Sequence, residues 1–133
     1  MLKHLPIRLI KGTDYSRQWV ERQTENLWRK ILDHSRPRII IAIQPDKYLC
    51  RAGRVEQIAI CDLQHGLIDS VTNPYYRELV ENAANQDLPN VFLCWDSRTA
   101  SIFEKLTVQK GIAVHVLGNP WFQRFLPWIP MTY

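Results

Sequence analysis

The segment Ile58-Ala59-Ile60-Cys61-Asp62-Leu63-Gln64-His65-Gly66 decides how this chain folds. An apolar run that changes abruptly to polar residues is typical of a buried strand, and here histidine and glycine follow the strand end. A second run, Ile112-Ala113-Val114-His115-Val116-Leu117, passes in the same way into Gly118-Asn119-Pro120. In open parallel sheets ligands bind at the carboxyl ends of the strands, so the two junctions indicate one shared crevice.

Strand-like and helix-like segments alternate along the rest of the chain. Apolar runs predict strands at 38–44, 57–63, 91–95 and 112–117. Helices are predicted from 74 and from 96 or 97, with a shorter helix from about 46 to 52 that Gly53 closes. We therefore expect an α/β fold, a Rossmann-like parallel sheet of at least four strands buried on both sides, with helices on both faces in a three-layer α/β/α arrangement.

A long helix is expected ahead of the sheet, over residues 13–34. Val20, Leu27 and Ile31 recur at helical spacing, and Trp28 and Leu32 widen this apolar stripe. The stripe predicts that the helix packs on the sheet, within one Rossmann-like domain that comprises residues 1–120. Residues 121–133 form an aromatic, proline-containing tail, which we expect to pack on this domain, on a second domain or on a partner chain.

Composition narrows the possible functions. A chain of 133 residues with 46% hydrophobic and 23% charged residues fits a single globular domain. The net charge of +4 is small and scattered, so we expect no nucleic-acid partner and at most a peripheral association with an anionic membrane. The longest apolar stretch, 39–43, is too short to cross a membrane, and no apolar signal segment begins the chain, which predicts a cytoplasmic location.

Neither a metal nor a cofactor is expected. The histidines lack metal-ligand spacing, and the chain contains no glycine-rich phosphate loop. The three cysteines are an odd number and widely spaced, so we interpret them as small buried hydrophobic residues: Cys50, Cys61 and Cys94.

Four motifs, taken in order, resemble a known enzyme family. The first motif is 62–68, at the end of one predicted strand, and the second is 73–76. The third is Leu88-Pro89, just before the strand that ends at Trp95, and the fourth is 116–120. Over residues 38–122 this order is similar to the N-terminal, acceptor-side domain of bacterial surface-polysaccharide glycosyltransferases with two Rossmann domains (GT-B-like). The resemblance implies that His65 is the catalytic base. It also implies a nucleotide-sugar donor bound by a second domain, which is missing here, so activity is expected only with a donor domain in the same or another chain.

The chemistry of His65 fits that role, because imidazole titrates near neutrality and a sugar hydroxyl needs a general base as it attacks the donor. A structural role, in which His65 hydrogen-bonds a neighbouring loop and supports the turn at Gly66, stays open. The candidate substrate-binding residues are Gln64, Gly66, Tyr75 and Asn119.

Asp62 and Asp69 flank the histidine and are candidates to orient it. On an ideal strand Asp62 shares a face with Gln64 and lies opposite His65, which favours a solvated or turn-capping acid. A second hypothesis for the whole chain is a non-catalytic Rossmann-like module that binds a partner protein, a phosphosugar or a nucleotide.

Overall fold

The computed structural model describes residues 12–68 and 74–124, and a parallel sheet of four strands forms its centre. The strands are β1 (Ile39–Ala42), β2 (Ala59–Leu63), β3 (Val91–Cys94) and β4 (Ala113–Val116). They lie side by side in the order of the chain, and every neighbouring pair is parallel. The predicted α/β, Rossmann-like parallel sheet is confirmed.

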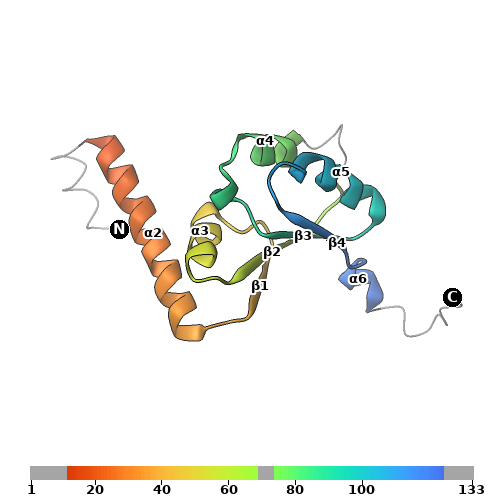
Figure 1. Ribbon diagram of the computed structural model, residues 1–133, viewed down its shortest axis with the longest axis horizontal. Coiled ribbons are helices and arrows are strands. Elements are labelled where there is room, and N and C mark those ends of the chain that lie inside the picture. Colours follow the sequence, from red (N-terminus) through yellow and green to blue (C-terminus); the bar gives the residue numbers. More distant parts are fainter. Residues whose placement is uncertain (1–11, 69–73, 125–133) are drawn as a thin grey trace, which may run out of the picture.

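Helices connect the strands and flank the sheet (Figure 1). Their bounds are α2 (Thr13–Ser35), α3 (Lys47–Val55), α4 (Pro74–Asn82), the 3₁₀ helix η1 (Asn85–Asp87), α5 (Ser97–Thr107) and α6 (Pro120–Gln123). Aspartates begin two of the helices: Asp46 accepts hydrogen bonds from the backbone N–H groups of Tyr48 and Leu49, and Asp96 accepts one from Thr99. None of the helices in the described stretches is both long and apolar enough to cross a membrane.

The register of the strands shows which face the connecting helices cover. Asp62 pairs with Phe92, and Phe92 pairs with Val114, so these side chains share one face with Ile40 and Ile60. Helix α3 packs on Ile60, and α4 and α5 pack on Phe92, so all three helices cover this one face. In the described part of the chain only the short helix α6 lies toward the other face, below the end of β4 (Figure 1).

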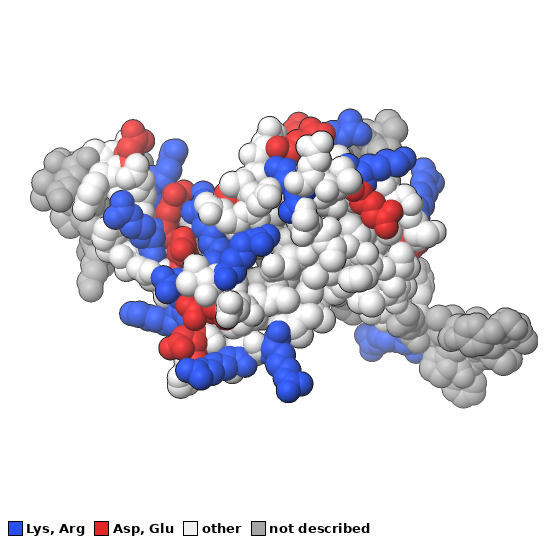
Figure 2. Space-filling view, in the orientation of Figure 1, with Lys and Arg blue, Asp and Glu red and all other residues white. Residues whose placement is uncertain are grey.

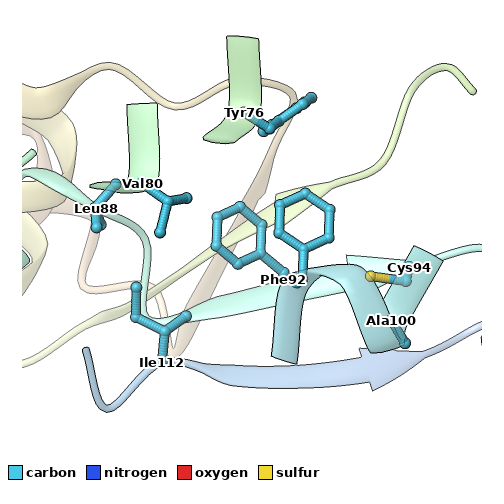
Figure 3. Close-up of a cluster of buried hydrophobic side chains, with 8 residues drawn as sticks. Tyr76, Val80, Leu88, Phe92, Cys94, Ala100 and Ile112 are labelled. Atoms are coloured by element: carbon cyan, nitrogen blue, oxygen red, sulfur yellow. The ribbon is translucent and has the colours of Figure 1, made fainter. Parts of the chain in front are cut away.

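The larger core cluster lies between β3, α4 and α5. The rings of Phe92 and Phe103 stack with their centroids 4.3 Å apart, and Tyr76 meets Phe103 edge-on at 5.3 Å. Figure 3 shows Tyr76 and Val80 of α4 above Phe92 of the sheet, with the Val80 side chain directed down toward the strands. Tyr76 is therefore a core residue, as its helical spacing with Val80 indicates.

Helix α2 packs on α3 and not on the strands, which corrects the prediction from its apolar stripe. Leu32 is buried against α3, but Val20, Leu27 and Ile31 are exposed. Trp28 and Leu32 form the apolar part of this contact, and beside them Lys47 of α3 binds Glu21 of α2 at 2.8 Å and Arg29 binds Glu56 at 3.2 Å. The predicted apolar stripe is therefore covered at Trp28 and Leu32 and exposed along the rest of its length.

Two further predictions are wrong in detail. Strand β1 is not buried on both sides, because Ile39 and Ile41 face the side that no described helix covers. Gly53 lies inside α3 and does not end it, because the helix passes so close to β2 that a Cβ atom on Gly53 would lie 2.5 Å from Cγ1 of Ile60.

We predict that Gly53→Ala destabilises the protein, although alanine is the better helix former. The clash with Ile60, whose side chain is fixed in the core, should cost about 1–3 kcal/mol, more than the gain in helix propensity of up to ~1 kcal/mol. Urea denaturation measures the change. Gly66→Ala is the control, because nothing lies within 4 Å of the added Cβ, and a Gly53→Ala variant as stable as this control would contradict the close approach.

Candidate functional site at the carboxyl edge of the sheet

A crevice of about 370 Å³ opens at the carboxyl ends of β1 and β2. It lies between the loop that joins β1 to α3, the middle of α4 and the segment after η1. Polar side chains lining it include Asp46, Lys47, Asp62 and Asp87, and apolar ones are Leu79, Ala83, Leu88 and Pro89. This is the edge at which Rossmann-like sheets hold their ligands, as the strand-end motifs indicated.

Two hollows of about 470 Å³ are larger but lie elsewhere. One follows the outer surface of α2, and the other lies beside Arg36 and Arg38, ahead of β1. Both are lined mainly by long, exposed polar side chains, so we place the candidate site in the smaller crevice, where a buried acid is present.

Asp62 is that acid. It lies on β2 with its side chain toward α3 and α4, and the residue is only 4% exposed. Its Oδ1 accepts a hydrogen bond of 2.9 Å from the backbone N–H of Gln44, which holds Gln44 in the left-handed region at φ 49°. A non-glycine residue in that region is uncommon, and Arg36 and Gln57, which follow helices α2 and α3, adopt it as well.

Burial raises the pKa of Asp62 to about 6, although the hydrogen bond from Gln44 and the positive charge of nearby His65 both lower it. Within the described residues no lysine or arginine forms an ion pair with this carboxyl. The expectation that Asp62 is solvated is therefore wrong. Its hydrogen bond to Gln44 does fix a turn, and its pKa lies close enough to neutrality for proton exchange with a ligand.

The other charged groups of the crevice are held by partners. Arg51 binds Asp87 through Nη2 at 3.1 Å and approaches Glu25 of α2 at 3.9 Å. Lys47 binds Glu21, whose hydrogen bond raises the pKa of Lys47. These contacts fix the walls of the crevice and leave Asp62 as the acid without a side-chain hydrogen-bond partner in the described region.

Gln64 was predicted to bind substrate, but its side chain is engaged within the fold. Its Oε1 accepts a hydrogen bond of 2.7 Å from the backbone N–H of Trp95, and its Nε2 donates one of 2.8 Å to the carbonyl of Gly66. The residue is buried, on the Asp62 side of the sheet as strand alternation predicts. Gln64 therefore ties the end of β2 to the end of β3 and closes the turn that carries His65.

His65 is exposed, two residues beyond the end of β2. It is near enough for its charge to act on Asp62, but it is not among the described residues that line the crevice. Nothing lies within 4 Å of the place where a Cβ on Gly66 would stand, so this side of the turn is open to a ligand. Whether His65 acts as a base stays a prediction.

The side chain of Asn119, which was predicted to bind substrate, is engaged in the cap of helix α6. Asn119 caps α6, its Oδ1 accepting a hydrogen bond of 2.9 Å from the N–H of Trp121, and Gly118 before it has φ 79°. These contacts match a strand-to-loop turn. The side chain of Tyr75 and the whole of Asp69 lie outside the described residues.

The predictions about the cysteines and about metal binding involve residues outside the crevice. Cys50, Cys61 and Cys94 are free and buried, as predicted, and burial raises the pKa of Cys50 and of Cys94 to about 12. Over residues 12–68 and 74–124 no group of histidine, cysteine and acidic residues is arranged to hold a metal ion.

Sequence reasoning underrated Asp62 and missed Gln44. The available signal was the acid itself, the one charged residue within the apolar run 58–63. A carboxyl at an inward-facing position of a parallel strand must be buried, and a buried carboxyl that no cation neutralises has a raised pKa.

We predict that Asp62→Asn stabilises the protein above pH 6. The pKa of Asp62 in the folded state, about 6, lies above the ordinary 3.8, so folding favours the protonated acid. The stability that this group provides is present below pH 4 and is lost as the pH rises through 6. Asparagine keeps the acceptor for Gln44, and the gain at pH 8 should be about 1–3 kcal/mol, disappearing toward pH 4.

Denaturation curves at pH 4, 6 and 8 measure this effect, with Glu78→Gln, at an exposed acid on α4, as the matched control. The difference in unfolding free energy between Asp62→Asn and the unsubstituted protein should grow with pH, and Glu78→Gln should show no such growth. A difference for Asp62→Asn that is independent of pH, or equal to that of the control, would contradict the raised pKa of Asp62.

We also predict that Gln64→Ala destabilises the protein by about 2–3 kcal/mol, because it leaves the N–H of Trp95 and the carbonyl of Gly66 without their partner. Thermal and urea unfolding measure the loss. Gln109→Ala, at an exposed position, should change stability by less than about 0.5 kcal/mol, and an equally small effect at Gln64 would refute its role in joining the strand ends.

Comparison with protein-family models, with curated proteins and with solved structures found no match for this chain. Its function has to be inferred from its own residues.

Proposed function

We propose that this chain is a Rossmann-like domain that binds a polyhydroxylated ligand, and that this ligand is the sugar acceptor of a glycosyltransferase of surface-polysaccharide biosynthesis. One observation carries the proposal: the Asp62 carboxyl is buried at the carboxyl edge of a parallel sheet, opens on the crevice, and has a pKa of about 6. An ionised acid that destabilises the fold and has no paired cation in the described region is better explained by ligand binding than by stability.

The lining of the crevice favours hydroxyl groups over phosphates. It holds three carboxylates, Asp46, Asp62 and Asp87, and its lysine, Lys47, is already bound to Glu21. Carboxylates accept hydrogen bonds from sugar hydroxyls and repel phosphate oxygens. The apolar wall formed by residues such as Leu79 and Leu88 offers a surface for the C–H groups of a sugar ring. The crevice thus suits an acceptor better than a nucleotide donor.

The transfer chemistry follows from the two titratable groups at this edge. As the acceptor oxygen attacks the anomeric carbon, its proton passes to a base, and the nucleoside diphosphate leaves from the other side of that carbon. Asp62, mainly ionised above pH 6, is the inner candidate for this base, and His65 on the exposed turn is the outer one. The donor is bound by a second domain, as the resemblance of the motifs implies.

A non-catalytic module that binds a partner protein is the second candidate. The observation that favours it is the cluster of exposed apolar side chains after β4, which includes Leu117, Trp121 and Phe122. Such a cluster is typical of surfaces that contact another protein or domain.

The two candidates differ in what a ligand titration shows. We predict that neutral oligosaccharides shift the amide NMR signals of Gln44, Asp62 and Leu79, and that nucleoside diphosphates do so only weakly. Asp62→Asn should reduce the affinity for the sugar about 10-fold to 100-fold, the effect of removing a hydrogen bond to a charged group.

Glu78→Gln, outside the crevice, should leave the affinity unchanged. Tighter binding of nucleotides than of sugars, or a sugar affinity that is unchanged in Asp62→Asn, would refute the proposal, and no binding of either ligand would favour the partner-binding module.

A further inference from the structure

One face of helix α2 holds the charged groups at the wall of the crevice. Three residues of α2, four and three positions apart and therefore on the same side of the helix, contact α3 or the residue that caps it. The three contacts are Glu21 with Lys47 at 2.8 Å, Glu25 with Arg51 at 3.9 Å, and Trp28 Nε1 with Oδ2 of Asp46 at 3.3 Å. Figure 2 shows acidic and basic side chains gathered together over α2 and the adjoining part of the molecule.

The ammonium group of Lys47 is held from two sides. Its Nζ donates a hydrogen bond of 2.8 Å to Oε1 of Glu21, and the Tyr48 hydroxyl donates one of 3.2 Å to the same oxygen. Nζ also lies 5.0 Å from the centroid of the Tyr48 ring, a distance at which an aromatic face attracts a cation. The hydrogen bond to Lys47 lowers the pKa of Glu21 and raises that of Lys47, so both groups stay charged at neutral pH.

Lys47 is also the cation that could neutralise Asp62. Among the described residues that line the crevice it is the one lysine or arginine. It lies three residues beyond Gln44, whose N–H is 2.9 Å from Oδ1 of Asp62. The groups that lower the pKa of Asp62 are nevertheless Gln44 and His65, and do not include Lys47. The remaining charged lining residues are the acids Asp46 and Asp87. The contact with Glu21 thus keeps a cation away from a carboxyl in the same crevice.

We propose that Glu21 is a positioning residue of the crevice: it holds Lys47 against α2 and so leaves the Asp62 carboxyl free to accept hydrogen bonds from a ligand. Without Glu21, the long and flexible side chain of Lys47 turns into the crevice and forms an ion pair with Asp62. This inference rests on the proposed function for the chemistry of the ligand. The position of Lys47, however, depends on no ligand and is tested without one.

Carbon-detected NMR of the Asp62 carboxyl measures the effect. In Glu21→Ala the titration midpoint of Asp62 should fall from about 6 by roughly 1–2 pH units, because a cation that comes within about 4–6 Å favours the ionised acid. Glu78→Ala, at an exposed acid on α4, removes the same charge and should leave the midpoint unchanged. In the double variant Glu21→Ala/Lys47→Gln the midpoint should return to about 6, because the released cation is gone.

The double variant separates this role from a merely structural one. If loss of the contact with α2 simply exposed Asp62 to water, its midpoint would stay low in the double variant, and the proposal would be wrong. An unchanged midpoint in Glu21→Ala would overturn it as well. Lys47→Gln alone covers the case in which Glu21→Ala folds poorly. It should leave the midpoint near 6, and a clear rise would show that Lys47 already acts on Asp62.

Sugar binding distinguishes this inference from the proposed function. Glu21→Ala should weaken the binding of neutral oligosaccharides about fivefold, the effect of one hydrogen bond, and the double variant should restore it. If the midpoints change as described but no sugar binds to any variant, the proposed function is wrong and the positioning role of Glu21 stands. If sugar binds through Asp62 and Glu21→Ala changes neither the midpoint nor the affinity, the positioning role is wrong and the proposed function stands.

Discussion

The handedness of the strand connections is the constraint on which the rest of this structure depends. The four strands lie in the sheet in chain order, so each connection moves one place in the same direction. Connections between parallel strands are right-handed, and successive right-handed steps in one direction put every connecting helix on the same face. Helices α3, α4 and α5 therefore share one face, and the other face is left to other segments.

The same constraint creates the candidate site. With α3 and α4 on neighbouring strand connections, the start of α3 and the middle of α4 lie beside the carboxyl ends of β1 and β2, and the crevice opens between them. Asp62 lies on the helix-covered side of β2, which buries it and raises its pKa. An acid one position earlier or later on the strand would face the opposite side of the sheet, away from α3 and α4. The chemistry proposed here thus follows from the alternation of side chains on one strand.

Most of the fold was predictable from the sequence, because the apolar runs and the aspartate caps at Asp46 and Asp96 are local signals. The four strands and their parallel pairing follow from them. The errors have non-local causes. Helix α2 packs on residues far along the chain, through Leu32 in the core cluster of α3 and through the pair of Glu21 with Lys47, 26 positions away. The exposure of β1 depends on strand order, which a hydropathy pattern does not contain.

The candidate site was not predictable as a set of residues. The sequence indicated one crevice shared by the strand ends at 64–66 and 118–120, whereas the crevice described here lies beside β1 and β2, and neither His65 nor Asn119 is among its described lining residues. The face shared by Asp62 and Gln64 does follow from strand alternation. Gln64 was assigned to substrate because its bonds to Trp95 and Gly66 involve another strand and a turn. The importance of Asp62 depends on burial by α3 and α4, which no residue near it in sequence reveals.

The central claim is that Asp62 is a buried acid that titrates near neutrality, and carbon-detected NMR of its side-chain carboxyl tests this most directly. The account predicts a titration midpoint of about 6 for Asp62. A midpoint near 3.8, the ordinary value for aspartate, would contradict it, because the crevice would then contain an ordinary solvated acid with no proton to exchange at neutral pH.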